Sequence, residues 1–170
     1  GVYFDRNAGV KRRKPIPNDQ LNQIQLECQK LDDDIRWLVA LLSDSGMRLA
    51  GAAGLTIEDI HLNCETPFIQ LKKHPWRSLK TASSARKVPL AGHSLWAAQR
   101  IICNHGGHLH AFPRYNARDT TSANSASAAL NKWLKDFVDK GCTIHSFRHS
   151  FRDRLRAVSC PGDIIDQLGG

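Results

Sequence analysis

The spacing of apolar residues changes along this chain from a helical period to an alternating one, and then back again. Between residues 18 and 53 apolar positions recur every three or four residues, which is the period of amphipathic helices. Three later segments are short, with alternating or β-branched apolar residues, and predict strands near 57–62, 68–72 and 87–90. We therefore expect an α+β fold, mainly helical, with a small three-stranded antiparallel sheet.

The helical period returns after the expected sheet. It predicts helices at 94–103, 125–138 and 143–158, and a short last helix from Pro161 through Leu168. The stretch 104–118 is rich in Gly, His and Pro and predicts a loop. Residues 1–17 are basic, contain Pro15 and Pro17, and offer little to bury, so we expect a linker there. The remaining residues, 18–170, are expected to form one domain.

The charge of the chain is unevenly distributed. Lys and Arg number 24 against 16 Asp and Glu, which gives a formal net charge of +8. From Thr66 to Arg118 the chain has no acidic residue, although it carries nine Lys or Arg and five His. A solvated surface usually mixes both signs, so a long block of one sign indicates a polyanionic partner. The alternative is a basic surface without a function.

Cysteine usage and hydropathy limit the compartment and class. The five cysteines are scattered, with no Cys-x-x-Cys pair, which favours free thiols in a reducing compartment over a disulfide framework. The longest apolar stretch, near Trp37 to Leu42, is too short to span a bilayer. The basic amino-terminal end has no apolar segment behind it and is not a secretory signal. We expect a cytoplasmic domain with no membrane partner.

The helix expected at 143–158 carries two neighbouring stripes. The apolar stripe should pack into the core and consists of Phe147, Phe151, Leu155 and Val158. The other stripe is almost purely basic and consists of His145, Arg148, His149, Arg152 and Arg156. Such a helix predicts a rigid platform for a phosphate, with a forked donor pair on Arg148 and a proton-transfer group on His145. A solvated basic helix is the alternative.

Three segments together resemble the tyrosine recombinases, the phage-integrase family. His145-Ser146-Phe147-Arg148-His149 is similar to the family's His-x-x-Arg-His box. Ser45-Gly46-Met47-Arg48-Leu49, followed by Gly54-Leu55-Thr56-Ile57-Glu58-Asp59-Ile60, resembles its first arginine box and the strand after it. The segment from Leu79 to Leu90 resembles the hairpin that carries the family's catalytic lysine. Each box alone is a weak signal, but three in the right order are a strong one.

The resemblance implies a site-specific recombinase that cuts and rejoins double-stranded DNA through a 3′-phosphotyrosyl intermediate, in a prophage or other mobile element. It implies that Arg48 and Arg148 stabilise charge on the phosphate, that Lys80 protonates the leaving oxygen, and that His145 assists as acid or base. No cofactor or metal is implied, and the full-length protein is expected to form a homo-tetramer on DNA. The positions expected to contact DNA are Lys72, Lys73, Arg77, Arg86, Lys87 and Arg152.

The sequence departs from the family pattern in three places. The family's His or Trp and its nucleophilic tyrosine are expected after Gln167-Leu168-Gly169-Gly170, and neither Tyr3 nor Tyr115 is in that position. We therefore expect residues 18–170 to be a catalytic domain that is incomplete at its carboxy-terminus and binds DNA without cutting it. The family's amino-terminal core-binding domain is expected to be missing as well, and residues 1–17 would be the tail of the interdomain linker. Gly51 stands where the family often has a glutamate, which could weaken support of the site.

Two further interpretations remain open at the level of sequence. Cys103, His105, His108 and His110 have spacings that could suit zinc, although no second ligand pair lies nearby. Trp76, in the basic block, is as consistent with DNA contact as with packing. The alternative to a recombinase is a non-catalytic DNA-binding module, a decayed or regulatory relative.

Overall fold

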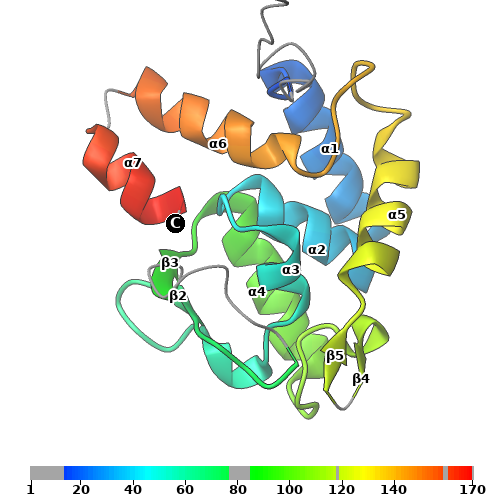
Figure 1. The fold of residues 1–170 in the computed structure, drawn as a ribbon, viewed down its shortest axis with the longest axis vertical. Coiled ribbons are helices and arrows are strands. Elements are labelled where there is room, and N and C mark those ends of the chain that lie inside the picture. The colour runs from blue at the N-terminus through cyan, green and yellow to red at the C-terminus, as the bar shows by residue number, and fades with distance from the viewer. Residues whose placement is uncertain (1–13, 77–84, 118, 159–160, 170) are drawn as a thin grey trace, which may run out of the picture.

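The structure is a computed structural model that describes residues 14–76, 85–117, 119–158 and 161–169 (Figure 1). The α-helices of this part are α1 (Asn18–Leu31), α2 (Asp34–Ser43), α3 (Leu49–Ala53), α4 (Gly92–His105), α5 (Ala123–Leu134), α6 (Ser146–Ala157) and α7 (Gly162–Gly169). Two short 3-10 helices, η1 and η3, span Ile57–Asp59 and Pro113–Tyr115. The strands are β1 (Ile60–His61), β2 (Phe68–Leu71), β3 (Arg86–Pro89), β4 (Asn116–Ala117) and β5 (Thr120–Thr121).

The expected α+β fold with a three-stranded antiparallel sheet is confirmed. The strand order is β1-β2-β3, and Ile69 at the centre of β2 is paired with Ile60 on one side and Val88 on the other. All three side chains are buried. The alternation read from the sequence therefore marks the inward face of this sheet.

Two details of the expected fold are wrong. The strand expected at 57–62 is reduced to Ile60–His61, because Ile57–Asp59 forms the 3-10 turn η1, closed by a hydrogen bond from Thr56 N to Asp59 Oδ2 of 3.0 Å. The expected loop at 104–118 contains the turn η3 and the strand β4, which pairs with β5 in a second small sheet. Strands of two residues are too short to show a period in sequence.

Helix α2 runs through the centre of the described part of the molecule, between α1 and α4 (Figure 1). It begins at an N-cap, where the Asp33 side chain accepts a hydrogen bond from Arg36 N. Every residue from Trp37 to Ser43 is buried, so the helix is apolar on all sides rather than on one stripe. No helix in the described ranges has the length and apolar character to cross a bilayer.

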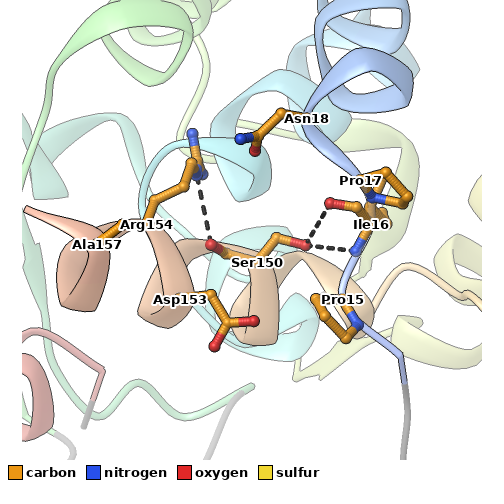
Figure 2. Close-up of a pocket in the computed structure, with 8 residues that line it drawn as sticks. All are labelled: Pro15, Ile16, Pro17, Asn18, Ser150, Asp153, Arg154 and Ala157. Carbon is orange, nitrogen blue, oxygen red and sulfur yellow. Dashed lines mark hydrogen bonds between the residues drawn. The ribbon is translucent and has the colours of Figure 1, made fainter.

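Hydrogen bonds and an ion pair attach helix α6 to the end of α2 and to the segment before α1. Arg154 forms an ion pair with Asp44 at 2.8 Å and donates to Ser43 O at the end of α2. Ser150 Oγ accepts from Ile16 N at 2.6 Å, so Ile16, within the stretch expected to be a linker, is 2% exposed. A pocket of about 360 Å³ lies between α6 and residues 15–18, and Figure 2 shows the Ser150 contacts at its wall.

The apolar stripe of α6 is only partly buried. Phe147 is 1% exposed, whereas Val158, expected in the same stripe, is 75% exposed. Val158 is the residue that follows the last turn of α6, so it lies past the surface that the helix covers. The expectation for Val158 is therefore wrong.

Gly46 holds the turn that leads from α2 to α3. Its φ is +67°, a conformation that L side chains rarely adopt. A Cβ added there would lie 2.5 Å from Cδ1 of Phe151 on α6. Only glycine allows the backbone to turn here while Phe151 packs against it.

Replacing Gly46 by alanine is expected to lower the free energy of unfolding by about 2 kcal/mol, because both the left-handed backbone and the Phe151 contact become unfavourable. Urea denaturation measures the change. Gly107→Ala is the matched control, because a Cβ at Gly107 meets no atom within 4 Å. Equal stability of the two variants would contradict the packing role given to Gly46.

Candidate nucleic-acid interface

Arg48 is placed at the start of α3 by the turn at Gly46. It occupies the N-cap position with extended backbone, φ −74° and ψ 146°, and its side chain is exposed. Its neighbours Met47 and Leu49 are both buried. The local sequence therefore fixes the backbone on both sides of Arg48 and leaves the guanidinium at the surface.

Arg148 approaches the same turn from α6. Its Nη1 donates to Gly46 O at 2.9 Å, across 102 residues of sequence. Phe147, the preceding residue, is buried in the core. The burial of one face of α6 and this hydrogen bond together hold the half-buried Arg148 beside the first arginine box.

Arg48, Arg86, Arg148 and Arg152 form one group of positive charges, which we call the arginine cluster. Burial and the charges of the other three lower the pKa of Arg148 to about 10, so it stays cationic at neutral pH. Burial and the charge of Arg48 also lower the pKa of Arg86. The cluster thus collects guanidinium groups from the start of α3, from β3 and from α6, and their mutual repulsion favours the binding of an anion among them.

Two members of the arginine cluster contact helix α7. Arg86 Nε donates to Leu168 O at 3.3 Å, and Arg152 forms an ion pair with Asp166. Figure 1 shows that the end of α7, the helix that follows α6 in the chain, is directed toward β3. The fold therefore places the last turn of α7 against the arginine cluster.

Of the two remaining expected catalytic residues, the structure describes His145 but not Lys80. His145 lies half-buried at the N-cap position of α6, one turn before Arg148. The expected catalytic residue Lys80 and the expected DNA contact Arg77 both lie outside the described residues. The structure thus brings together Arg48 and Arg148, with His145 adjacent in the same helix.

The other expected DNA contacts lie on the sheet. Lys72, Lys73 and Lys87 are all exposed. Lys72 Nζ is 3.6 Å from Asp59 Oδ1, and Lys87 Nζ lies 4.8 Å from the centre of the Phe68 ring. These lysines are available to solvent on and next to the strands that also carry Arg86.

A network that the sequence did not reveal joins η1 to the segment after β2. Asp59 is fully buried, and its Oδ2 lies 2.8 Å from His74 Nε2. The His74 ring stacks on Trp76, whose Nε1 donates to Gly54 O at 2.9 Å. Trp76 is therefore a packed residue in this structure. Neither Asp59 nor His74 has a sequence spacing that would have indicated the pair.

The histidines near residue 105 take part in local contacts. His105 Nδ1 is 2.8 Å from Ala111 O, and the ring of His110 lies edge-on to Trp76. Burial, and next the charge of His74, lower the pKa of His110, so it is neutral at pH 7. In the described ranges no three side chains of His, Cys, Asp or Glu gather in a way that could hold a metal ion.

Two further residues concern the expected site. Tyr115 is 6% exposed in η3, and burial raises its pKa, so its hydroxyl is poorly placed for attack on DNA. Gly51 is buried in α3, and a Cβ there would lie 3.4 Å from Leu71 Cδ1 of β2. A larger side chain at this position would therefore pack directly against Leu71, where α3 contacts the sheet.

Comparisons with known proteins identify similar sequences and folds. Residues 14–170 match the model of the phage integrase family. The tyrosine recombinase XerD of Halalkalibacterium halodurans is 29% identical over 126 residues, which cover 69% of this chain and 39% of that protein.

Two solved structures have a similar fold at low sequence identity. XerH site-specific recombinase, bound to a palindromic difH substrate, has a TM-score of 0.72 at 20% identity, over 98% of this chain and 48% of that one. The integrase of transposon Tn1549, in complex with transposon right-end DNA, has a TM-score of 0.68 at 20% identity, over 95% and 59%. The chain thus spans less than two thirds of the length of each of these relatives.

Proposed function

The chain belongs to the phage integrase family, the tyrosine recombinases, and from this premise we propose that residues 18–170 form a catalytic domain that binds double-stranded DNA for strand exchange. The observation that carries the proposal is the arginine cluster. Its two arginines from the family's boxes, Arg48 and Arg148, come from distant parts of the sequence and converge at Gly46. The DNA complexes of XerH and the Tn1549 integrase support duplex DNA as the ligand.

In the proposed reaction the guanidinium groups of Arg48 and Arg148 bind the non-bridging oxygens of one phosphodiester. Negative charge builds on these oxygens when phosphorus is attacked, and preorganised cations stabilise it. His145, one helical turn before Arg148, would donate or accept a proton at the same phosphate. Lys80 is proposed to protonate the leaving 5′-oxygen. This chemistry needs no bound metal or cofactor.

The nucleophile is proposed to be a tyrosine that is neither Tyr3 nor Tyr115. Attack by a tyrosine hydroxyl forms a 3′-phosphotyrosyl bond and releases a 5′-hydroxyl, and the reverse attack rejoins the strand. Tyr115 is excluded from this role because it is buried in η3 as part of the core. The 170 residues on their own are therefore proposed to bind DNA without cutting it.

The full-length protein is proposed to act in the cytoplasm as a homo-tetramer on DNA, as an integrase of a prophage or other mobile element. A second candidate, a DNA-binding module that has lost catalysis, is favoured by one residue only. Gly51 replaces the glutamate common in the family, at the contact between α3 and β2. DNA binding is common to both candidates, and only strand cleavage separates them.

Duplex DNA is expected to bind the 170-residue chain with an affinity that falls steeply as salt rises. Each neutralised phosphate contributes a slope of about −0.9 to log K against log salt. Arg48→Ala and Arg148→Ala should each weaken binding and reduce the slope by about 1. Fluorescence anisotropy with a labelled duplex, measured between about 50 and 200 mM NaCl, tests this.

Arg114→Ala is the matched control for these variants. It also removes one arginine, but Arg114 is paired with Asp34 at 2.7 Å and is not a member of the arginine cluster. Its slope should stay at that of the unmodified chain. The proposed interface would be contradicted if the unmodified chain showed no salt-dependent binding. It would also be contradicted if Arg114→Ala weakened binding as much as Arg48→Ala and Arg148→Ala do.

A further inference from the structure

The last turn of α7 brings negative groups to the arginine cluster. Asp166 and Leu168 lie two residues apart on this helix of eight residues. The Asp166 carboxylate pairs with Arg152, and the Leu168 carbonyl accepts from Arg86. Carbonyl groups in the last turn of a helix carry the negative end of its dipole. Helix α7 therefore already places acceptor groups against two of the four guanidiniums of the cluster.

The ion pair between Asp166 and Arg152 is more accessible to a competing anion than the hydrogen bond between Arg86 and Leu168 O. The Asp166 side chain is 74% exposed, whereas that of Arg152 is 25% exposed. An ion pair with one partner in solvent contributes little, because water and salt screen it. A DNA phosphodiester likewise offers two negatively charged oxygens that accept from a guanidinium, and its binding adds the release of counterions.

Arg152 also belongs electrostatically to the phosphate site. Its charge is one of the three that lower the pKa of Arg148, and the two residues lie one turn apart on α6. A phosphate next to the one at Arg148 along a DNA strand would meet Arg152. While Asp166 holds Arg152, that position is occupied by a carboxylate of the protein itself.

We propose that Asp166 is an internal competitor of DNA, and that its carboxylate must leave Arg152 before this arginine can bind a backbone phosphate. The inference rests on the proposed function, because it concerns a second phosphate position of the same site. Asp166 then lowers affinity for DNA in general. Its ion pair is also one of the contacts between α7 and α6, and DNA binding breaks this contact.

The variant Asp166→Asn separates competition from a purely structural role. Competition predicts that the variant binds a duplex about two- to fivefold more tightly, since an exposed ion pair no longer has to be broken. The same variant should melt at a slightly lower temperature, by no more than about 4 °C, because the free protein loses that pair. A structural role of Asp166 would instead weaken both DNA binding and stability.

Two further variants test whether the gain in affinity depends on Arg152 or only on the loss of a negative charge. Asp153→Asn also removes one negative charge near α6, but Asp153 pairs with Arg156 at 3.2 Å and not with the arginine cluster. It should leave affinity within about 1.5-fold of the unmodified chain if charge at a distance is well screened. In an Arg152→Ala background the gain from Asp166→Asn should disappear, because the contested guanidinium is gone.

The outcomes are distinct for the two proposals. Tighter binding by Asp166→Asn that requires Arg152 and is absent from Asp153→Asn supports the competitor. An equal gain in Asp153→Asn, a gain that persists without Arg152, or weaker binding by Asp166→Asn overturns it. If the unmodified chain shows no salt-dependent binding to the same duplex, the proposed function fails, and the competitor fails with it.

Discussion

Replacing Asp59 by alanine is expected to lower the free energy of unfolding by about 3–5 kcal/mol, because two groups that are largely shielded from water each lose their hydrogen-bonding partner, at a cost of about 1–3 kcal/mol per group. Asp59 is fully buried and accepts from Thr56 N at 3.0 Å while it contacts His74 Nε2 at 2.8 Å. Without the carboxylate, the Thr56 amide and the His74 ring, 11% exposed, lose their partner away from water. Lys72, at 3.6 Å, would lose a counter-charge.

Chemical denaturation of the purified chain measures this loss, and Glu58→Ala is its matched control. Glu58 is the adjacent acidic residue in η1, but it is exposed, so its removal should change stability by no more than about 0.5 kcal/mol. If Asp59→Ala and Glu58→Ala were equally stable, the buried pair would not be what holds η1 to the segment after β2.

The sequence predicted the parts of the fold that depend on a local period. The α6 stripe placed Phe147 in the core and Arg148 beside it, because both positions follow from 3.6 residues per turn. The alternation near 68–72 and 87–90 likewise predicted the strands β2 and β3, in which Ile69 and Val88 prove to be buried. The prediction failed where elements are shorter than one period, as in η1 and in β4.

The candidate site was predictable only in its separate pieces. Arg48 and Arg148 were recognised from two boxes, but their convergence at Gly46 depends on a left-handed turn and on Phe151 packing across it. The pairs Asp59–His74 and Arg152–Asp166 join different elements of the fold. No sequence period links such residues, because their distance is set by how η1, the sheet, α6 and α7 pack together.

The proposed binding of one phosphate by Arg48 and Arg148 has the largest expected consequence in catalysis. In the longest reading frame that contains these 170 residues, Arg148→Ala is expected to slow covalent attachment to DNA by about 10²–10³-fold, the usual effect of removing one preorganised donor to a transition-state oxyanion. Arg148→Lys should recover only part of the rate, because an ammonium lacks the forked donor pair. Single-turnover formation of a covalent protein–DNA band on nicked duplex measures the rate.

A slower reaction can come from weaker DNA binding, from a disturbed fold or from a slower chemical step. Arg148 also donates to Gly46 O, so Arg148→Ala could act by disturbing the turn rather than the phosphate. Measuring the rate at saturating DNA concentration excludes weaker binding as the cause of a slower reaction. Arg48 has an exposed side chain, so Arg48→Ala should keep the thermal stability of the unmodified chain, and a slower reaction in this variant is then not caused by misfolding. A loss of at least about 10²-fold in both alanine variants, with Arg114→Ala at the unmodified rate, assigns the arginines to the transition state. Attachment within tenfold of the unmodified rate in Arg48→Ala would instead favour a DNA-binding module whose arginines only hold the backbone.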